Sequence, residues 1–164
     1  MTLPKTLKTP ALDPMTLKPR TGSGYPEPYR SRVLPREKRQ LGDACGLTKI
    51  GINHSTLPPG KESSMRHWHT HEDEFIFVLS GEVVVKTDAG EQVLKAGMCA
   101  GFPASADGKS GDGHQLINRS NEPAVYLEIS NRDKADEAFY PDVDLHFNGD
   151  SAEVMFTRKD GSRF

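Results

Sequence analysis

Short stretches of alternating hydrophobic and polar residues fill the middle of the chain, and such alternation is typical of half-buried β-strands. The alternation begins at residues 47–57, LTKIGINHSTL, where Ile50, Ile52 and His54 share one face. Residues 75–80, FIFVLS, are apolar on both faces, which predicts a strand buried on both sides. These stretches predict the first strands of a β-sheet.

Turn residues divide the rest of the middle into further strands. Residues 81–97, GEVVVKTDAGEQVLKAG, predict two strands joined by an Asp-Ala-Gly turn, hence a hairpin. Residues 114–130 predict a second hairpin with its turn at RSNEP. Residues 98–113 lie between the two and predict a short strand followed by a long loop of Gly, Asp and Ser. Many short strands joined by glycine and proline turns indicate an all-β sandwich or barrel.

The first 32 residues carry six of the 12 prolines and almost no periodicity. Pro26 and Pro28 fix their own φ and push the preceding residues to extended conformations, so GSGYPEPYRSR is not expected to propagate a helix. Two alternatives stay open for this segment: a disordered tail, or an ordered extended arm that lies on the barrel or on a partner. In the second case Tyr25 and Tyr29 are the expected anchors.

The C-terminal part holds the one stretch that favours a helix, NRDKADEAFYPDVDL at 131–145, where Pro141 would end it. Residues 152–164, AEVMFTRKDGSRF, predict one more strand and an Asp-Gly turn. The expected organisation is an extended arm, a β-barrel and a C-terminal extension that packs on or near the barrel. These parts span 1–32, 33–131 and 132–164.

Composition narrows the class of protein. A chain of 164 residues can form one domain with a real core. The net charge is −2 and there is no basic run, which argues against nucleic-acid binding. No stretch approaches the ~18 apolar residues of a membrane span, and the N-terminus has no apolar signal segment, so we expect a cytoplasmic protein that does not bind membranes. Cys45 and Cys99 are too few for a disulfide framework and are expected to be packed small side chains.

Residues 66–81, RHWHTHEDEFIFVLSG, bring histidines and acids together directly before the apolar strand. In an extended segment His67 and His69 point to one side and Trp68 to the other. Two imidazoles at this spacing can bind one divalent ion, at ~2.0–2.2 Å from each nitrogen. THED resembles a turn, which resets the alternation before Glu74 begins the next strand.

The strand that Glu74 begins has two distinct faces. Ile76 and Val78 share the face of Glu74 and are expected to look inward. The other face would contact another layer or a second subunit, and it carries Phe75, Phe77 and Leu79.

The chain resembles the cupin family at two motifs. The first motif is a glycine, a short gap, His-x-His, three or four residues, a glutamate, six residues and a glycine. Here it is matched by Gly60, His67, His69, Glu74 and Gly81, with one residue more than usual after Gly60. The second motif is a glycine, five residues, a proline, a gap, a histidine, three residues and an asparagine. It is matched by Gly97, Pro103, His114 and Asn118.

The resemblance covers about residues 45–131 and implies the double-stranded β-helix, or jelly-roll barrel, of cupins. It implies that the metal ligands are His67, His69, Glu74 and His114. Three imidazoles and a carboxylate suit one divalent transition metal per chain: manganese, iron, nickel or zinc. The alternative is a cupin without a metal, its histidines hydrogen-bonded inside the barrel. Desolvation of four titratable groups with no ion to pair them weakens that alternative.

One departure from the family concerns the barrel mouth. Cupins usually have Pro-x-Gly-x-x-His, whereas ten residues, ASADGKSGDG at 104–113, separate Pro103 from His114 here. The insertion bears more on the shape of the barrel mouth than on the role of His114 as a metal ligand. Lys109 within it is either a solvated lysine or a contact to an anionic substrate.

The expected activity follows from the size of the barrel and from the resemblance. A small barrel holds one small ligand, and a metal site favours an oxygen-rich metabolite as substrate or ligand. The resemblance to sugar-phosphate-isomerase cupins favours a metal-dependent isomerase. An Fe(II)-dependent dioxygenase and a non-catalytic ligand-binding protein are the alternatives, because the fold does not fix the reaction. The resemblance also implies a homodimer.

The remaining polar candidates carry weaker expectations. The acid/base candidates are Glu74, if it releases the metal, and His71, which is otherwise a solvated turn residue. Two further histidines are expected to be structural or solvated, His54 at the core or rim and His146 on the surface. The strand after the second motif has two side chains that could look into the barrel, Tyr126 and Glu128.

Overall fold

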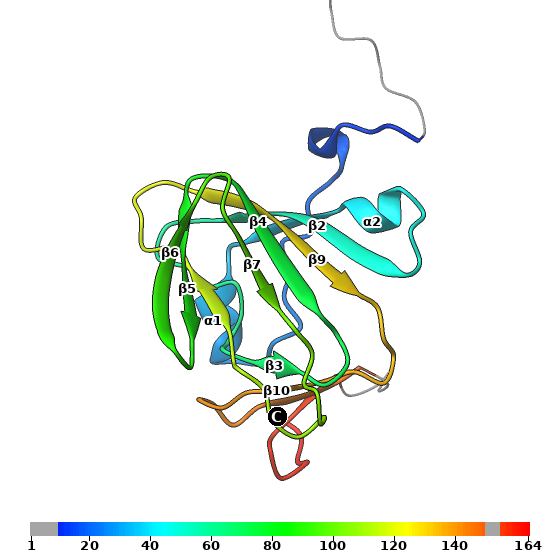
Figure 1. Cartoon of the computed structure of the whole chain (residues 1–164), viewed down its shortest axis with the longest axis vertical. Helices are drawn as coiled ribbons and strands as arrows, with labels where there is room; N and C mark the ends of the chain where they lie inside the picture. The colour runs from blue at the N-terminus through cyan, green and yellow to red at the C-terminus, as the bar shows by residue number, and fades with distance from the viewer. Residues whose placement is uncertain (1–9, 150–154) are drawn as a thin grey trace, which may run out of the picture.

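The computed structural model describes residues 10–149 and 155–164, and they form an all-β fold, as the sequence predicts (Figure 1). The helical segments are η1 (Pro14–Thr16), α1 (Tyr29–Val33) and α2 (Leu41–Ala44). The strands are β1 (Glu37–Gln40), β2 (Ile50–Leu57), β3 (Trp68–His69), β4 (Glu74–Ser80), β5 (Glu82–Thr87), β6 (Gly90–Lys95), β7 (Cys99–Phe102), β8 (Gln115–Ile117), β9 (Ala124–Asn131), β10 (Glu137–Phe139), β11 (His146–Asn148) and β12 (Phe156–Thr157).

The described residues form three antiparallel sheets, two of which make up the jelly roll. The largest has the order β1-β2-β9-β4-β7, and a smaller one the order β6-β5-β8. Side chains from both sheets form the main core, whose buried members are Leu57, Ile76, Val78, Val83, Val85, Leu116, Ala124 and Tyr126. The third sheet, β12-β11-β10-β3, lies at the lower end of the view in Figure 1. This arrangement leaves one end of the jelly roll covered by β3 and by the C-terminal strands.

One predicted hairpin is confirmed and the other is wrong. β5 and β6 pair over their whole length, down to Thr87 opposite Gly90. β8 and β9 do not pair with each other: β8 pairs with β5, whereas β9 lies between β2 and β4. The connection crosses from one sheet to the other, and the buried Asn118 holds this corner by donating to the carbonyls of Leu57 and Glu122. Local sequence gives the turn but not the sheet to which each strand goes.

The predicted inward face of β4 is confirmed, since Ile76 and Val78 are both buried. The prediction that this strand is buried on both sides is wrong within one chain. Phe75 is 39% exposed and Leu79 is 42% exposed on the outer face. On β2 the buried side chains are Ser55 and Leu57, so His54 lies on the opposite face from the core.

The N-terminal segment contacts the rest of the chain from Arg20 onward, where Arg20 forms a β-bridge with Lys38, which favours the arm alternative for that part; residues 1–9 lie outside the described residues. Tyr25 is buried, and Tyr29 packs against the same cluster. The expectation that this segment forms no helix is wrong, because α1 begins directly after Pro28. A proline is tolerated there because the first turn of a helix does not use its own N–H groups.

A second core cluster joins the two ends of the chain. Its buried members are Tyr25, Val33, Met65, Ala138, Tyr140 and Leu145. The helix expected at 131–145 is not formed: β10 occupies residues 137–139, because Ala138 faces the second cluster and the strand pairs with both β3 and β11. The predicted last strand is present as β12.

Two smaller expectations concern the cysteines and membrane-spanning segments. The expectation of packed cysteines is wrong, since Cys45 and Cys99 are both free and exposed. Within the described residues, every helix is too short to cross a membrane.

The second cluster should contribute measurably to stability. Leu145 is fully buried in it, so Leu145→Ala should lower the free energy of unfolding by about 2–5 kcal/mol. Met15→Ala, at a side chain that is 64% exposed, should change it by less than about 0.5 kcal/mol. Urea unfolding followed by circular dichroism measures both. Equal stability of the two variants would show that the C-terminal extension is not part of the folded core.

Candidate metal centre

Two of the three motif histidines are joined through their backbones. The N–H of His67 donates to the carbonyl of His114, and the N–H of His114 donates to the carbonyl of His67, at 3.1 and 2.8 Å. This antiparallel bridge brings the two imidazole centroids to 4.7 Å of each other. Both side chains are buried. The two histidines, 47 positions apart in the sequence, thus meet at one place in the fold.

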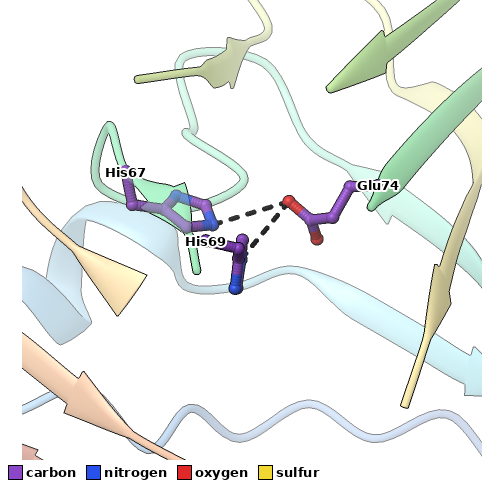
Figure 2. A group of neighbouring side chains, drawn as sticks. All are labelled: His67, His69 and Glu74. Atoms are coloured by element: carbon purple, nitrogen blue, oxygen red, sulfur yellow. Dashed lines mark ion pairs between the residues drawn. The ribbon is translucent and has the colours of Figure 1, made fainter. Parts of the chain in front are cut away.

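The short strand β3 places the third histidine beside the first. His67 and His69 lie on the same side with ring centroids 4.9 Å apart, as the strand alternation predicts. Trp68 points the other way and stacks on Phe139. After the turn at residues 70–73, Glu74 begins β4 and points back toward the histidines (Figure 2).

Glu74 is the centre of the group. Its Oε2 lies 3.7 Å from Nε2 of His67 and 3.5 Å from Nε2 of His69, the two pairs drawn as dashed lines in Figure 2. The same oxygen lies 2.6 Å from Nε2 of His114. The ligand atoms of His67, His69 and Glu74 all lie within 4.8 Å of one another, so these residues could hold a metal ion.

The outer nitrogens of two imidazoles fix where their lone pairs point. Nδ1 of His67 donates to the carbonyl of Met65 at 2.8 Å, and Nδ1 of His69 donates to Oδ2 of Asp136 at 2.6 Å. When both rings are neutral, Nε2 is therefore an unprotonated acceptor in each. Both acceptors face the carboxylate of Glu74, and Nε2 of His69 is buried with no hydrogen-bond partner among the described residues. Burial lowers the pKa of His69, but the hydrogen bond to Asp136 and the charge of Glu74 outweigh it and raise that pKa, so either a proton on Nε2 of His69 or a metal ion can supply a positive charge here.

His114 is arranged differently. Its Nε2 donates to Glu74 in this structure, and its Nδ1 is buried without a partner among the described residues. Its ring stacks flat on Phe102 with centroids 3.8 Å apart, which fixes the plane of the imidazole. To bind an ion, His114 would give up the Nε2 proton that it now shares with Glu74.

The donor spacings fit one small ion. Two donors that each lie ~2.1 Å from a common ion are separated by about 3.0–3.4 Å. The distances from Glu74 to His67 and His69, 3.7 and 3.5 Å, lie just above this range, and the 2.6 Å to His114 lies below it. His114 is not among the residues whose ligand atoms all lie within 4.8 Å of one another, so its ring would have to move for it to share the ion. The donor set of three imidazoles and one carboxylate is the chemistry that divalent transition metals prefer.

The environment changes the proton affinities of the cluster. Burial, together with the charges of His114 and His69, lowers the pKa of His67 to about 3, so this ring is neutral at physiological pH. Burial alone would raise the pKa of Glu74, but the hydrogen bond from His114 and the nearby imidazoles hold that pKa well below its usual range. Glu74 is therefore ionised. A neutral imidazole and an ionised carboxylate are the forms that bind a metal.

Asp136 supports the cluster from the C-terminal extension and was missed by the sequence analysis. Its buried carboxylate accepts from Nδ1 of His69 and from the backbone N–H groups of His71 and Glu72, at 2.6, 2.8 and 3.2 Å. One side chain thus fixes both the ring of His69 and the turn that leads to Glu74. Such outer partners orient ligands and set their basicity. His69, Glu72 and Asp136 also form a second group of possible ligands.

A cavity of about 210 Å³ opens in front of the cluster. The jelly roll contributes the histidines, Glu74, Ile76, Phe102 and Leu116 to its wall. The arm and β1 contribute Tyr25, Arg36 and Lys38, and the C-terminal extension contributes Ala138, Tyr140, Phe147 and Phe156. Tyr140 stacks on His67, and its hydroxyl lies 3.3 Å from that of Tyr25. The two ends of the chain therefore complete the site.

The other candidates from the sequence lie in different places. His71 is exposed in the turn, where it contacts the hydroxyl of Thr70, and it does not line the cavity. Lys109 is exposed, and the insertion at 104–113 packs beside β3 and likewise does not line the cavity. Glu128 lines the cavity and Tyr126 is buried in the main core. His146 is partly buried and contacts Glu137, contrary to the expectation of a surface position.

Two substitutions of Asp136 should separate its effect on the orientation of the His69 ring from its effect on overall stability. In Asp136→Asn one oxygen can still accept from the two turn amides, but the new NH2 group faces Nδ1 of His69 and forces the ring proton onto Nε2. We expect the affinity for Zn²⁺ to fall about 10–100-fold. The free energy of unfolding should fall by a smaller proportion. Asp136→Ala also leaves buried amides without an acceptor and should cost about 2–5 kcal/mol.

Competitive zinc titration and urea unfolding measure the two effects, with the exposed Asp160→Asn as control. Unchanged zinc affinity in a folded Asp136→Asn protein would show that Asp136 does not orient the cluster.

Comparisons with known proteins agree with this site. The cupin domain model matches residues 53–130, which contain all four motif side chains. A crystal structure of a sugar phosphate isomerase of the cupin superfamily from Silicibacter pomeroyi is 38% identical, with a TM-score of 0.85 over 94% of this chain and 96% of that chain. A structure from Acidithiobacillus ferrooxidans, provisionally assigned as a sugar phosphate isomerase, is 30% identical, with a TM-score of 0.67 over 79% of this chain and 80% of that one.

A curated relative shares a shorter region. The tetracenomycin polyketide synthase protein TcmJ from Streptomyces glaucescens is 33% identical over 88 residues, which are 53% of this chain and 54% of that protein. This chain therefore matches only about half the length of that relative. The likeness to the Silicibacter structure extends over nearly all of both chains and includes the arm and the C-terminal extension. On the strength of the two motifs, the jelly roll and this full-length likeness, the chain belongs to the cupin superfamily.

Proposed function

We propose that His67, His69, Glu74 and His114 hold one divalent transition metal per chain: manganese, iron, nickel or zinc. The observation that carries this proposal is the convergence of Nε2 of His67 and Nε2 of His69 on the ionised Glu74 inside a cavity. A buried arrangement of this kind is costly without a cation. A divalent ion bound by three neutral imidazoles and the carboxylate of Glu74 would leave the cluster with a net positive charge.

We propose further that the protein is a metal-dependent isomerase that acts on a small sugar phosphate. The support is the full-length similarity to the Silicibacter pomeroyi sugar phosphate isomerase, together with a cavity that admits one small polar molecule. Full-length similarity matters because the cavity wall includes residues from both ends of the chain. The cavity also offers hydroxyl and charged groups on the wall around the cluster.

The residues of the cavity supply the parts that such a reaction needs. A bound divalent ion would act as a Lewis acid that polarises a substrate carbonyl. Tyr25 and Tyr140 stay protonated, because burial raises the pKa of both phenols, and their hydroxyls can donate to substrate oxygens. The proton that moves between neighbouring carbons needs a base, and the carboxylates that line the cavity are those of Glu74 and Glu128. Phe102, Phe147 and Phe156 contribute apolar surface to the cavity wall.

We also propose that the molecule forms a homodimer through the outer face of the largest sheet. Phe75 and Leu79 are exposed there, on a strand whose apolar pattern is typical of burial on both sides. Cover by a second copy of the chain would account for that pattern.

Metal content tests the ligand assignment. Protein purified without chelator and without a histidine tag should contain close to one equivalent of metal by plasma mass spectrometry. His114→Ala and His69→Ala should each lose most of it, because three donors remain from a set of four. His54→Gln removes an imidazole from outside the cavity and should keep full content. Full metal content in folded His114→Ala would refute the assignment of His114.

Isotope incorporation tests the isomerase proposal. The metal-loaded protein, incubated in D2O with a panel of aldose and ketose phosphates, should interconvert one pair and place deuterium on the carbon that exchanges its proton, as followed by NMR. Protein stripped of metal should be at least 100-fold slower. Loaded protein that converts none of the panel would contradict the proposal, and O2 consumption with such protein would instead favour the dioxygenase alternative.

A further inference from the structure

Arg36 is a cation without a partner on the cavity wall. It lies between α1 and β1, and its side chain lines the same cavity as the histidine cluster. Among the described residues it forms neither a hydrogen bond nor an ion pair, and its Nε is buried with no acceptor. Charged groups at such positions are normally paired, because desolvation of an unpaired charge is costly. An anionic group from outside the chain would supply the missing partner.

The charges around Arg36 leave it free for a ligand. Four residues with formal charges line the cavity apart from the histidines: Arg36, Lys38, Glu74 and Glu128. Lys38 already pairs with Glu128 at 2.6 Å, and Glu74 is engaged by the imidazoles. A divalent ion at the cluster would more than offset Glu74. Among the described side chains on this wall, Arg36 is the cation that has no carboxylate partner.

Neighbouring groups connect Arg36 with the metal cluster and with the outside. The phenols of Tyr25 and Tyr140 feel the charges of both Arg36 and Glu74, and Tyr140 stacks on His67. On its other side Arg36 lines a second hollow of about 180 Å³, together with Arg20 and Lys38. Arg20 is held beside Lys38 by a pair of backbone hydrogen bonds. Arg36 and Lys38 therefore line both hollows and give them a positive wall in common.

We propose that Arg36 is the anion-binding residue of the active cavity: it binds the terminal oxyanion of the substrate, a phosphoryl or carboxylate group, while the other end of the same small molecule reaches the histidine cluster. The inference rests on the proposed function, and it deepens it by naming the residue that selects anionic substrates. The guanidinium offers forked donors that match such an oxyanion. The hydroxyls of Ser63, Ser64 and Tyr25 line the same cavity and can donate to its remaining oxygens.

Binding of inorganic phosphate, measured by isothermal titration calorimetry, tests the proposal without any turnover. Arg36→Gln should weaken phosphate binding at least tenfold while metal content and melting temperature stay close to those of the parent. Arg36→Lys keeps a charge and should lose less. Arg30→Gln, in the exposed part of α1, is the matched control and should bind phosphate normally. Succinate in place of phosphate shows whether the carboxylate or the phosphoryl group is preferred.

The outcomes separate this inference from the proposed function. Normal phosphate binding by Arg36→Gln overturns the anion site even if the protein holds its metal. Phosphate binding that His114→Ala loses and Arg36→Gln keeps also overturns it, because the anion would then bind at the metal cluster. Phosphate binding that depends on Arg36, in protein that holds no metal, supports the anion site and refutes the proposed metal function.

If Arg36→Gln does not fold, the parent protein supplies the test. Phosphate should shift the Nε–H resonance of Arg36 in ¹⁵N NMR spectra and leave that of Arg30 in place. An unchanged Arg36 resonance at saturating phosphate overturns the proposal.

Discussion

Acceptor groups that face one another inside the cavity are the constraint on which the rest of the site depends. Two imidazole lone pairs point at an ionised carboxylate, and their directions are fixed from behind by the carbonyl of Met65 and by Asp136. Rotation of either ring would break a buried hydrogen bond, which costs about 1–3 kcal/mol for the group left unpaired. The fold therefore concentrates these donors around one carboxylate, where a proton on His69, whose pKa Asp136 and Glu74 raise against the effect of burial, or a metal ion supplies the positive charge. The backbone bridge between His67 and His114 adds the third imidazole to the same centre.

Two hydrophobic cores hold the parts of the site in place. The main core between the two sheets of the jelly roll holds Ile76 and Val78 inward and so aims Glu74 at the start of the same strand. The second cluster joins the arm to the C-terminal extension and supplies the opposite wall of the cavity. The barrel alone would present the cluster to solvent on that side. Closure by the two ends of the chain lowers the local dielectric and strengthens each charge interaction within the cavity.

Much of the barrel could be predicted from local patterns, and the parts that could not depend on long-range contacts. His67 and His69 share a face because strand alternation requires it, and the β5–β6 hairpin follows from a two-residue turn. The path of β9 between β2 and β4 has no local signal, because a turn does not reveal which sheet the next strand joins. Residues 137–139 became a strand rather than part of a helix because pairing with β3 overrides a weak helical propensity. Asp136 and Arg36 are distant from both motifs in sequence, so their proximity to the cluster could be seen only in the fold. Lys109 had the right charge for an anion contact but lies outside the cavity.

Anomalous diffraction from crystals of the zinc- or manganese-loaded protein would show directly whether one cation lies between the imidazoles and Glu74. We predict one strong anomalous peak per chain, ~2.0–2.2 Å from Nε2 of His67, His69 and His114 and from a carboxylate oxygen of Glu74. A peak among His69, Glu72 and Asp136, or a loaded crystal with no peak at either group and the four side chains unchanged, would contradict it.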